Sequence, residues 1–146
     1  MKLAPPQRGA VLRYAYLWAD EQRRGKEEGR KDRPVLVMAV SVVEREGSTQ
    51  LLVLAITHSR PKSPTDAVAL PRRVRNRLGL GEQDSWIVTT EANAFVWPGP
   101  DIRPVPGRKP PTVIYGHVPD GVLQEAARSF LGNRARQRAQ FVKRTR

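Results

Sequence analysis

Two long apolar runs dominate the pattern of hydrophobic and polar positions along the chain. They cover residues 34–43 (PVLVMAVSVV) and 51–57 (LLVLAIT), and Gly47 and Ser48 between them are typical of a turn. Strands that are buried on both faces have continuous apolar sequences of this kind. We therefore expect a β-hairpin at the centre of a sheet. The side chains expected in its core are Val35, Val37, Leu52, Leu54 and Ile56.

Shorter apolar patterns on either side of this hairpin predict further elements. In the expected strands, aromatic and β-branched residues are frequent. In the expected helix, Pro71 fits the first turn and Gly79 fits the C-terminal end. The ranges are 11–18 (VLRYAYLW), 67–70 and 85–97 for strands, and 71–80 (PRRVRNRLGL) for a short helix.

The C-terminal part of the chain predicts one longer helix and then a basic tail. An apolar stripe at helical spacing follows Asp120, which is a candidate N-cap. After Gly132 all the charged residues are basic. We therefore expect a frayed tail at about 132–146 that adds salt-sensitive affinity for RNA. This order predicts one domain over residues 1–146, of the α+β class and mostly β, with a five- to seven-stranded small barrel and a C-terminal helix. The stripe consists of Leu123, Ala126, Ala127, Phe130 and Leu131.

Three polar segments separate these elements. Residues 19–32 (ADEQRRGKEEGRKD) are almost wholly charged, which predicts a solvated loop that orders over a bound partner, or alternatively an exposed helical hairpin. Residues 58–66 and the proline-rich residues 98–111 predict loops.

The charge of the chain narrows the choice of partner. Its 26 Lys and Arg against 14 Asp and Glu give a net charge of +12, and arginine far outnumbers lysine. Such an excess attracts polyanions, and the planar guanidinium suits phosphates and stacked bases. We expect a nucleic-acid partner. An acidic protein partner, or an arginine-rich proteome, is the alternative explanation.

The chain has too few cysteine and histidine residues for a disulfide-bonded protein or a typical zinc protein. The chain has no cysteine and only His58 and His117, so disulfides and cysteine-based metal sites are excluded, and we expect no metal and no cofactor. The first nine residues do not have the pattern of a signal peptide, and no apolar run reaches the length of a membrane span. We therefore expect a cytoplasmic protein without membrane association.

Four short segments together resemble a known family. In this order they are similar to the MazF/PemK (Kid-like) toxins of type II toxin–antitoxin systems, over about residues 8–131. The chain departs from the family at Ala10, where the family has an aspartate, at residues 26–29 (KEEG), and at Glu91-Ala92-Asn93, which lacks the family's glutamine. The segments are Arg8-Gly9-Ala10-Val11, Arg33-Pro34-Val35-Leu36-Val37, Val53-Leu54-Ala55-Ile56-Thr57 and Gln83-Asp84-Ser85.

The resemblance implies an SH3-like barrel that forms a homodimer and cleaves single-stranded RNA without metal, as an mRNA interferase that a cognate antitoxin neutralises. Arg33 would be the family's catalytic arginine and Thr57 its partner. A guanidinium can donate two parallel hydrogen bonds to a phosphate, which suits an electrostatic role. The imidazole of His58 can transfer protons near neutral pH, so His58 is a third catalytic candidate. The RNA-binding candidates are Arg30, Lys31, Arg60 and Lys62.

Other interpretations of these residues remain open. Arg33 could form a surface ion pair before a buried strand, and His58 and His117 could be loop histidines without function. Residues 71–80 are similar to a segment of AbrB-like DNA-binding antitoxins, so a non-catalytic nucleic-acid-binding module is one alternative. A gyrase-binding toxin like CcdB is another. Four aromatic residues could stack bases or pack in the core, namely Tyr14, Tyr16, Trp86 and Trp97.

Overall fold

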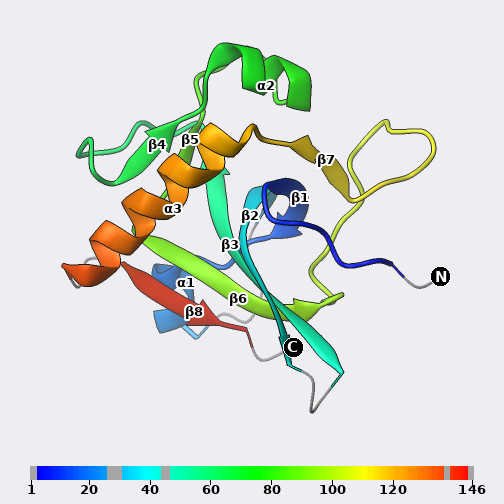
Figure 1. The fold of residues 1–146 in the computed structure, drawn as a ribbon, viewed down its shortest axis with the longest axis horizontal. Helices are drawn as coiled ribbons and strands as arrows, with labels where there is room; N and C mark the ends of the chain where they lie inside the picture. The colour runs from blue at the N-terminus through cyan, green and yellow to red at the C-terminus, as the bar shows by residue number, and fades with distance from the viewer. Residues whose placement is uncertain (1–2, 26–30, 44–46, 137–138, 145–146) are drawn as a thin grey trace.

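The computed structural model describes residues 3–25, 31–43, 47–136 and 139–144. Its strands form one large sheet, and three helices lie around it (Figure 1). In chain order they are β1 (Ala10–Ala15), α1 (Ala19–Arg23), β2 (Asp32–Val43), β3 (Ser48–Thr57), β4 (Ala67–Ala69), α2 (Arg72–Leu78), β5 (Trp86–Val88), β6 (Glu91–Trp97), β7 (Ile114–His117), α3 (Asp120–Ala135) and β8 (Gln140–Lys143).

The β2–β3 hairpin is the centre of the sheet, as its two apolar runs predict. Its antiparallel register runs from Val35 opposite Ala55 to Val43 opposite Ser48. The strand order is β4-β5-β3-β2-β1-β7, and β6 joins β3 to β8. All these pairs are antiparallel except β6–β8. The described residues form an α+β fold that is mostly β.

The sheet is open, so the expected closed barrel is not confirmed. Strands β4 and β7 stand at the two ends of the main path and do not pair with each other. β3 is shared between two branches, because its N-terminal half pairs with β6 and its last two residues pair with β5. The described part of the chain has eight strands, more than the five to seven that the sequence predicts.

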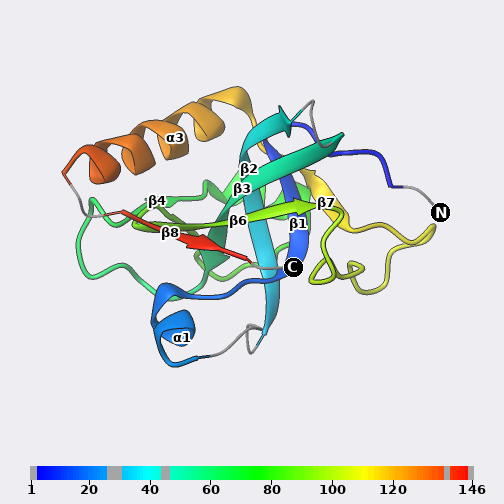
Figure 2. The ribbon, with the colours of Figure 1, turned by 90° about the horizontal axis from the view of Figure 1, so that it is seen from below.

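Two apolar layers cover the two faces of the hairpin. Side chains alternate along β2, so Leu36 packs on one face and Val35 on the other. The first layer includes the buried sides of α2 and α3, and Figure 2 shows α3 on one side of the strands and α1 on the other. Of the five core residues expected, Leu52 is half-buried; the fully buried ones are Val35, Val37, Leu54 and Ile56.

The helices α2 and α3 form where the sequence predicts them, but α3 differs from its prediction at Asp120 and Leu131. Gly79 adopts a φ of 72° and ends α2, as the expected C-terminal glycine should. Asp120 is not the N-cap of α3, because Pro119 has the extended backbone of that position and Asp120 is the first helical residue. Leu131 is 62 % exposed, so the last buried apolar residue of α3 is Phe130. A helical pattern shows which face is apolar, while the neighbouring elements decide how far burial extends.

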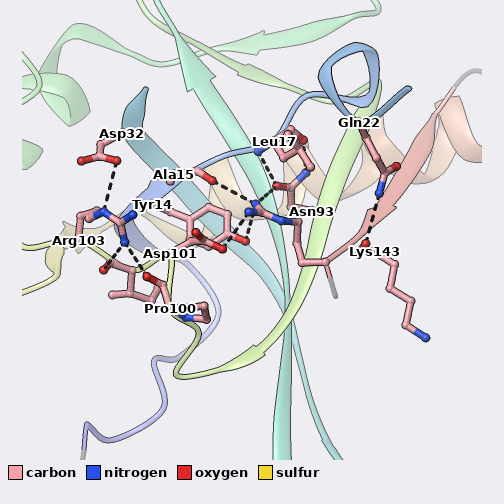
Figure 3. A network of polar contacts seen from close by, with 12 residues as sticks. Tyr14, Ala15, Leu17, Gln22, Asp32, Asn93, Pro100, Asp101, Arg103 and Lys143 are labelled. Carbon is pink, nitrogen blue, oxygen red and sulfur yellow. Dashed lines mark hydrogen bonds and ion pairs between the residues drawn. The ribbon is translucent and has the colours of Figure 1, made fainter. Parts of the chain in front are cut away.

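The basic C-terminal segment is not frayed where the structure describes it. α3 continues to Ala135, and β8 then pairs in parallel with β6. Arg144 is buried and forms an ion pair with Asp101 at 2.8 Å. Its guanidinium also donates to Tyr14 Oη at 3.0 Å, to the Ala15 carbonyl at 3.1 Å and to Asn93 Oδ1 at 3.1 Å. Figure 3 shows these four partner residues converging from β1, β6 and the loop after β6.

The expected tail is therefore wrong for residues 139–144. Charge runs usually predict solvated segments, but here the acidic partner Asp101 lies 43 residues away in the sequence, where no local pattern connects the two.

Candidate functional site

Arg33 and Thr57 lie at the same end of the β2–β3 hairpin. The register between the two strands ends at Val35 opposite Ala55, and Arg33 and Thr57 each lie two residues beyond that pair. Both line a cavity of about 320 Å³, here called the hairpin cavity. Its lining residues are Lys31, Asp32, Arg33, Pro34, Ile56, Thr57, His58, Ser59, Leu80 and Ser85.

Arg33 is a cation without an anionic contact in the described part of the chain. None of the ion pairs among these residues includes it, and its buried Nε has no hydrogen-bond partner there. Its Cζ lies 5.0 Å from the centre of the Trp18 ring. Burial lowers the pKa of Arg33, and nearby Glu21 and Tyr16 partly offset this effect. A guanidinium stays charged at neutral pH, so the position favours an anionic ligand.

Thr57 and His58 both reach the hairpin cavity, although adjacent strand residues point to opposite faces. β3 ends at Thr57, so the alternation of a strand no longer constrains His58. Thr57 Oγ1 accepts a hydrogen bond from the Ser59 amide at 3.1 Å. His58 Nδ1 lies 3.0 Å from the Asp84 carbonyl oxygen and 3.1 Å from Ser85 Oγ. The hairpin cavity thus has a cation, a hydroxyl and an imidazole in its wall.

A second cavity of about 450 Å³, here called the flanking cavity, shares Arg33 and Lys31 with the first. Its aromatic wall comes from the segment between β1 and α1, and its acidic wall comes from α1 and the start of β6. Arg33 and Lys31 therefore contribute to the walls of both cavities. The lining residues are Tyr16, Trp18, Asp20, Glu21, Arg24, Lys31, Arg33 and Glu91.

Glu91 is an acid of the flanking cavity that burial and hydrogen bonds affect. Its Oε1 accepts hydrogen bonds from the Ala19 amide at 2.9 Å and from Tyr16 Oη at 3.3 Å. Burial raises the pKa of Glu91, and the hydrogen bonds from Ala19 and Tyr16 partly offset this. Burial and the neighbouring Glu91 raise the pKa of Tyr16. Such perturbed groups in a cavity are frequent at functional sites, and structural networks also produce them.

Replacing Glu91 with glutamine should make stability less dependent on pH. Because burial raises the pKa of Glu91, the folded chain keeps this proton at pH values where the unfolded chain has lost it. The stabilisation is fully present below the unfolded pKa and is lost as pH rises through the folded pKa. As pH rises through this range, Tm should therefore fall less for Glu91→Gln than for the wild type. Glu125→Gln, at an exposed helical position, is the control, and parallel curves for Glu91→Gln and wild type would contradict the prediction.

The candidate RNA-binding residues are not all brought together. Lys31 lines both cavities, whereas Arg60 and Lys62 are exposed in the loop after β3 and line neither. Arg30 lies outside the described residues. His117, exposed at the end of β7, also lines neither cavity.

The charged segment at 19–32 differs from its prediction. Residues Ala19–Arg23 form α1, and the side chains of Ala19 and Glu21 are buried, so a wholly solvated loop is wrong there. Residues 26–30 lie outside the described part. Sequence reasoning also missed Trp18 as a site residue, although it closes the aromatic run 11–18. Of the aromatics it did single out, Trp86 is half-buried; the core ones are Tyr14, Tyr16 and Trp97.

The described residues hold neither a cluster of metal ligands nor a membrane-spanning helix. Within residues 3–25, 31–43, 47–136 and 139–144, no three His, Asp or Glu side chains gather as metal ligands would. No helix in these ranges is both long and apolar enough to span a bilayer.

Comparisons with known proteins leave the site to be interpreted from its geometry. A scan against models of protein families finds no family that matches this chain. A search of curated proteins finds no significant relative either. The assignment of function therefore rests on the residues around Arg33 and on the sequence resemblance.

Proposed function

We propose that this protein is an endoribonuclease that cleaves single-stranded RNA without a metal ion, as its resemblance to the MazF/PemK toxins implies. One observation carries the proposal: Arg33 is a partly buried cation that forms no ion pair with the described residues, and it lines one cavity with Thr57 and His58. A phosphate would supply a direct ion pair in addition to the attraction of the nearby Glu21. The net charge of +12 supports a polyanionic substrate.

Arg33, Thr57 and His58 suit a reaction in which the 2′-hydroxyl of the RNA is the nucleophile. The 2′-hydroxyl attacks the adjacent phosphorus, the bond from phosphorus to O2′ forms, and the bond to O5′ breaks. Arg33 would stabilise the charge on the crowded phosphorus through parallel hydrogen bonds, and Thr57 would orient the phosphate. His58 would carry protons. The products would be a 2′,3′-cyclic phosphate and a 5′-hydroxyl.

The flanking cavity has room for the nucleotide next to the cleaved bond. Trp18 supplies an aromatic face beside Arg33, and stacking on such a face is tolerant of base identity. Lys31, shared by both cavities, would contact the phosphate backbone between them.

The resemblance carries further parts of the proposal. It implies a homodimer in the cytoplasm and a cognate antitoxin that blocks the site. It also implies an SH3-like barrel, of which the open sheet would be a distorted form.

The test is the end chemistry of single-stranded RNA incubated with purified protein in EDTA. Fragments with 2′,3′-cyclic phosphate and 5′-hydroxyl ends would support the proposal, and Arg33→Ala purified in the same way controls for contaminating ribonucleases. Intact RNA at every salt concentration would reject it. A shift of duplex DNA would then favour the binding module, and capture of gyrase would favour a CcdB-like toxin.

A further inference from the structure

The hydrogen bonds around His58 define which ring nitrogen carries the proton. Nδ1 lies 3.0 Å from the backbone carbonyl oxygen of Asp84. A carbonyl oxygen can only accept a hydrogen bond, so this contact requires N–H at Nδ1. In a neutral imidazole the other nitrogen, Nε2, then has the lone pair.

Ser85 fits the same assignment. Its Oγ lies 3.1 Å from His58 Nδ1 and 3.4 Å from the carbonyl oxygen of Gln83. If the hydroxyl donates to Gln83, its oxygen accepts from Nδ1–H together with the Asp84 carbonyl. The opposite tautomer would direct the lone pair of Nδ1 at the lone pairs of the carbonyl, which is repulsive.

Burial and strand pairing fix the position of Ser85, which contacts His58 Nδ1. Ser85 is 1 % exposed, so water cannot easily replace its hydroxyl. Trp86, the next residue, pairs with Thr57 in the β3–β5 ladder, which fixes Ser85 relative to the end of β3. In the described part of the chain Nε2 has no hydrogen-bond partner, and His58 is one of the residues that line the hairpin cavity.

We infer that Ser85, together with the Asp84 carbonyl, is a positioning residue that holds the neutral form of His58 with its proton on Nδ1, which leaves Nε2 as a proton acceptor beside the hairpin cavity. The catalytic use of Nε2 rests on the proposed function. Nε2 takes the proton of the 2′-hydroxyl as the bond from O2′ to phosphorus forms and the bond to O5′ breaks. The net proton transfer is from O2′ to O5′, through His58 and water. Thr57 and Arg33 have no role in proton transfer.

The tautomer can be measured without any substrate. The chain has only two histidines, so long-range ¹⁵N–¹H spectra of labelled protein in alkaline buffer, assigned with His117→Gln, report directly on His58. The wild type should have predominantly Nδ1–H, and Ser85→Ala should move part of the population to Nε2–H. A wild-type ring with predominantly Nε2–H overturns the inference, even if Ser85→Ala does not fold.

Cleavage rates then separate this inference from the proposed function. Ser85→Ala should lower kcat about tenfold with KM unchanged, less than the hundredfold or more that a general base contributes. The double variant His58→Ala/Ser85→Ala should be no slower than His58→Ala alone, because Ser85 acts through His58. Additive losses would overturn the positioning role. A wild type with Nδ1–H that leaves RNA intact would reject the ribonuclease while supporting the hydrogen-bond assignment.

Discussion

Arg144→Ala should lower the free energy of unfolding by about 3–5 kcal/mol, the cost of removing one partner of a buried ion pair. The side chains of Arg144 and Asp101 are 2 % and 3 % exposed and lie 2.8 Å apart. The variant leaves the Asp101 carboxylate buried without this guanidinium. It also removes the donors to Tyr14, Ala15 and Asn93, which connect β1 and β6. Urea unfolding followed by circular dichroism measures the loss.

Arg103→Ala is the matched control. Arg103 also pairs with an acid, Asp32, at 3.7 Å, but both side chains are about one-third exposed, at 34 % each (Figure 3). Exposed ion pairs contribute about 0–1 kcal/mol. Equal losses for Arg103→Ala and Arg144→Ala, or no loss for Arg144→Ala, would show that burial of the Arg144 pair is not what stabilises the fold.

The same contacts change what a C-terminal truncation should do. The sequence predicts a frayed basic tail at about 132–146 that adds salt-sensitive affinity for RNA, and deletion of such a tail would leave the fold intact. Removal of the segment would also remove β8, the buried Val142 and Arg144. The fold should lose stability, so truncation cannot isolate an electrostatic contribution to RNA binding.

Elements with strong local patterns could be predicted from the sequence, and elements that depend on distant partners could not. The β2–β3 hairpin and α2 have continuous apolar runs or clear end signals, and the structure has both. β7 has only four residues, of which Gly116 is one, and no alternation distinguishes it from the loop before it. β8 forms by parallel pairing with β6, across a helix, which no local pattern indicates.

The candidate site follows the same division. Antiparallel register alone places Arg33 near Thr57, so sequence order was sufficient for that pair. Strand alternation alone does not require Thr57 and His58 to share a site, and both line the hairpin cavity because β3 ends at Thr57, a boundary that no local pattern defines. Trp18 and Glu91 meet at Arg33 only because α1 packs beside the start of β6, 72 residues away in the sequence.

Arg33→Ala should reduce the rate of RNA cleavage by roughly a hundredfold, about 3 kcal/mol, by analogy with the removal of one donor from an oxyanion site. Arg33→Lys should not restore the rate, because an ammonium lacks the planar fork that donates two parallel hydrogen bonds. Single-turnover rates on a single-stranded RNA, with protein in excess, measure the loss. Arg128→Ala, which removes the same charge from an exposed position on α3, should cleave at the wild-type rate.

Stability separates a catalytic role of Arg33 from a structural one. Burial without a described hydrogen bond at Nε opposes folding, so Arg33→Ala should leave the free energy of unfolding unchanged or raise it. An arginine that only held the fold together would give the opposite result, a loss of stability that matches the loss of activity. Because a substrate phosphate would form a direct ion pair with Arg33, single-stranded RNA with methylated 2′-hydroxyls, which cannot be cleaved, should stabilise the wild type more than Arg33→Ala in thermal unfolding. Equal stabilisation of both proteins would show that the phosphate does not bind at Arg33.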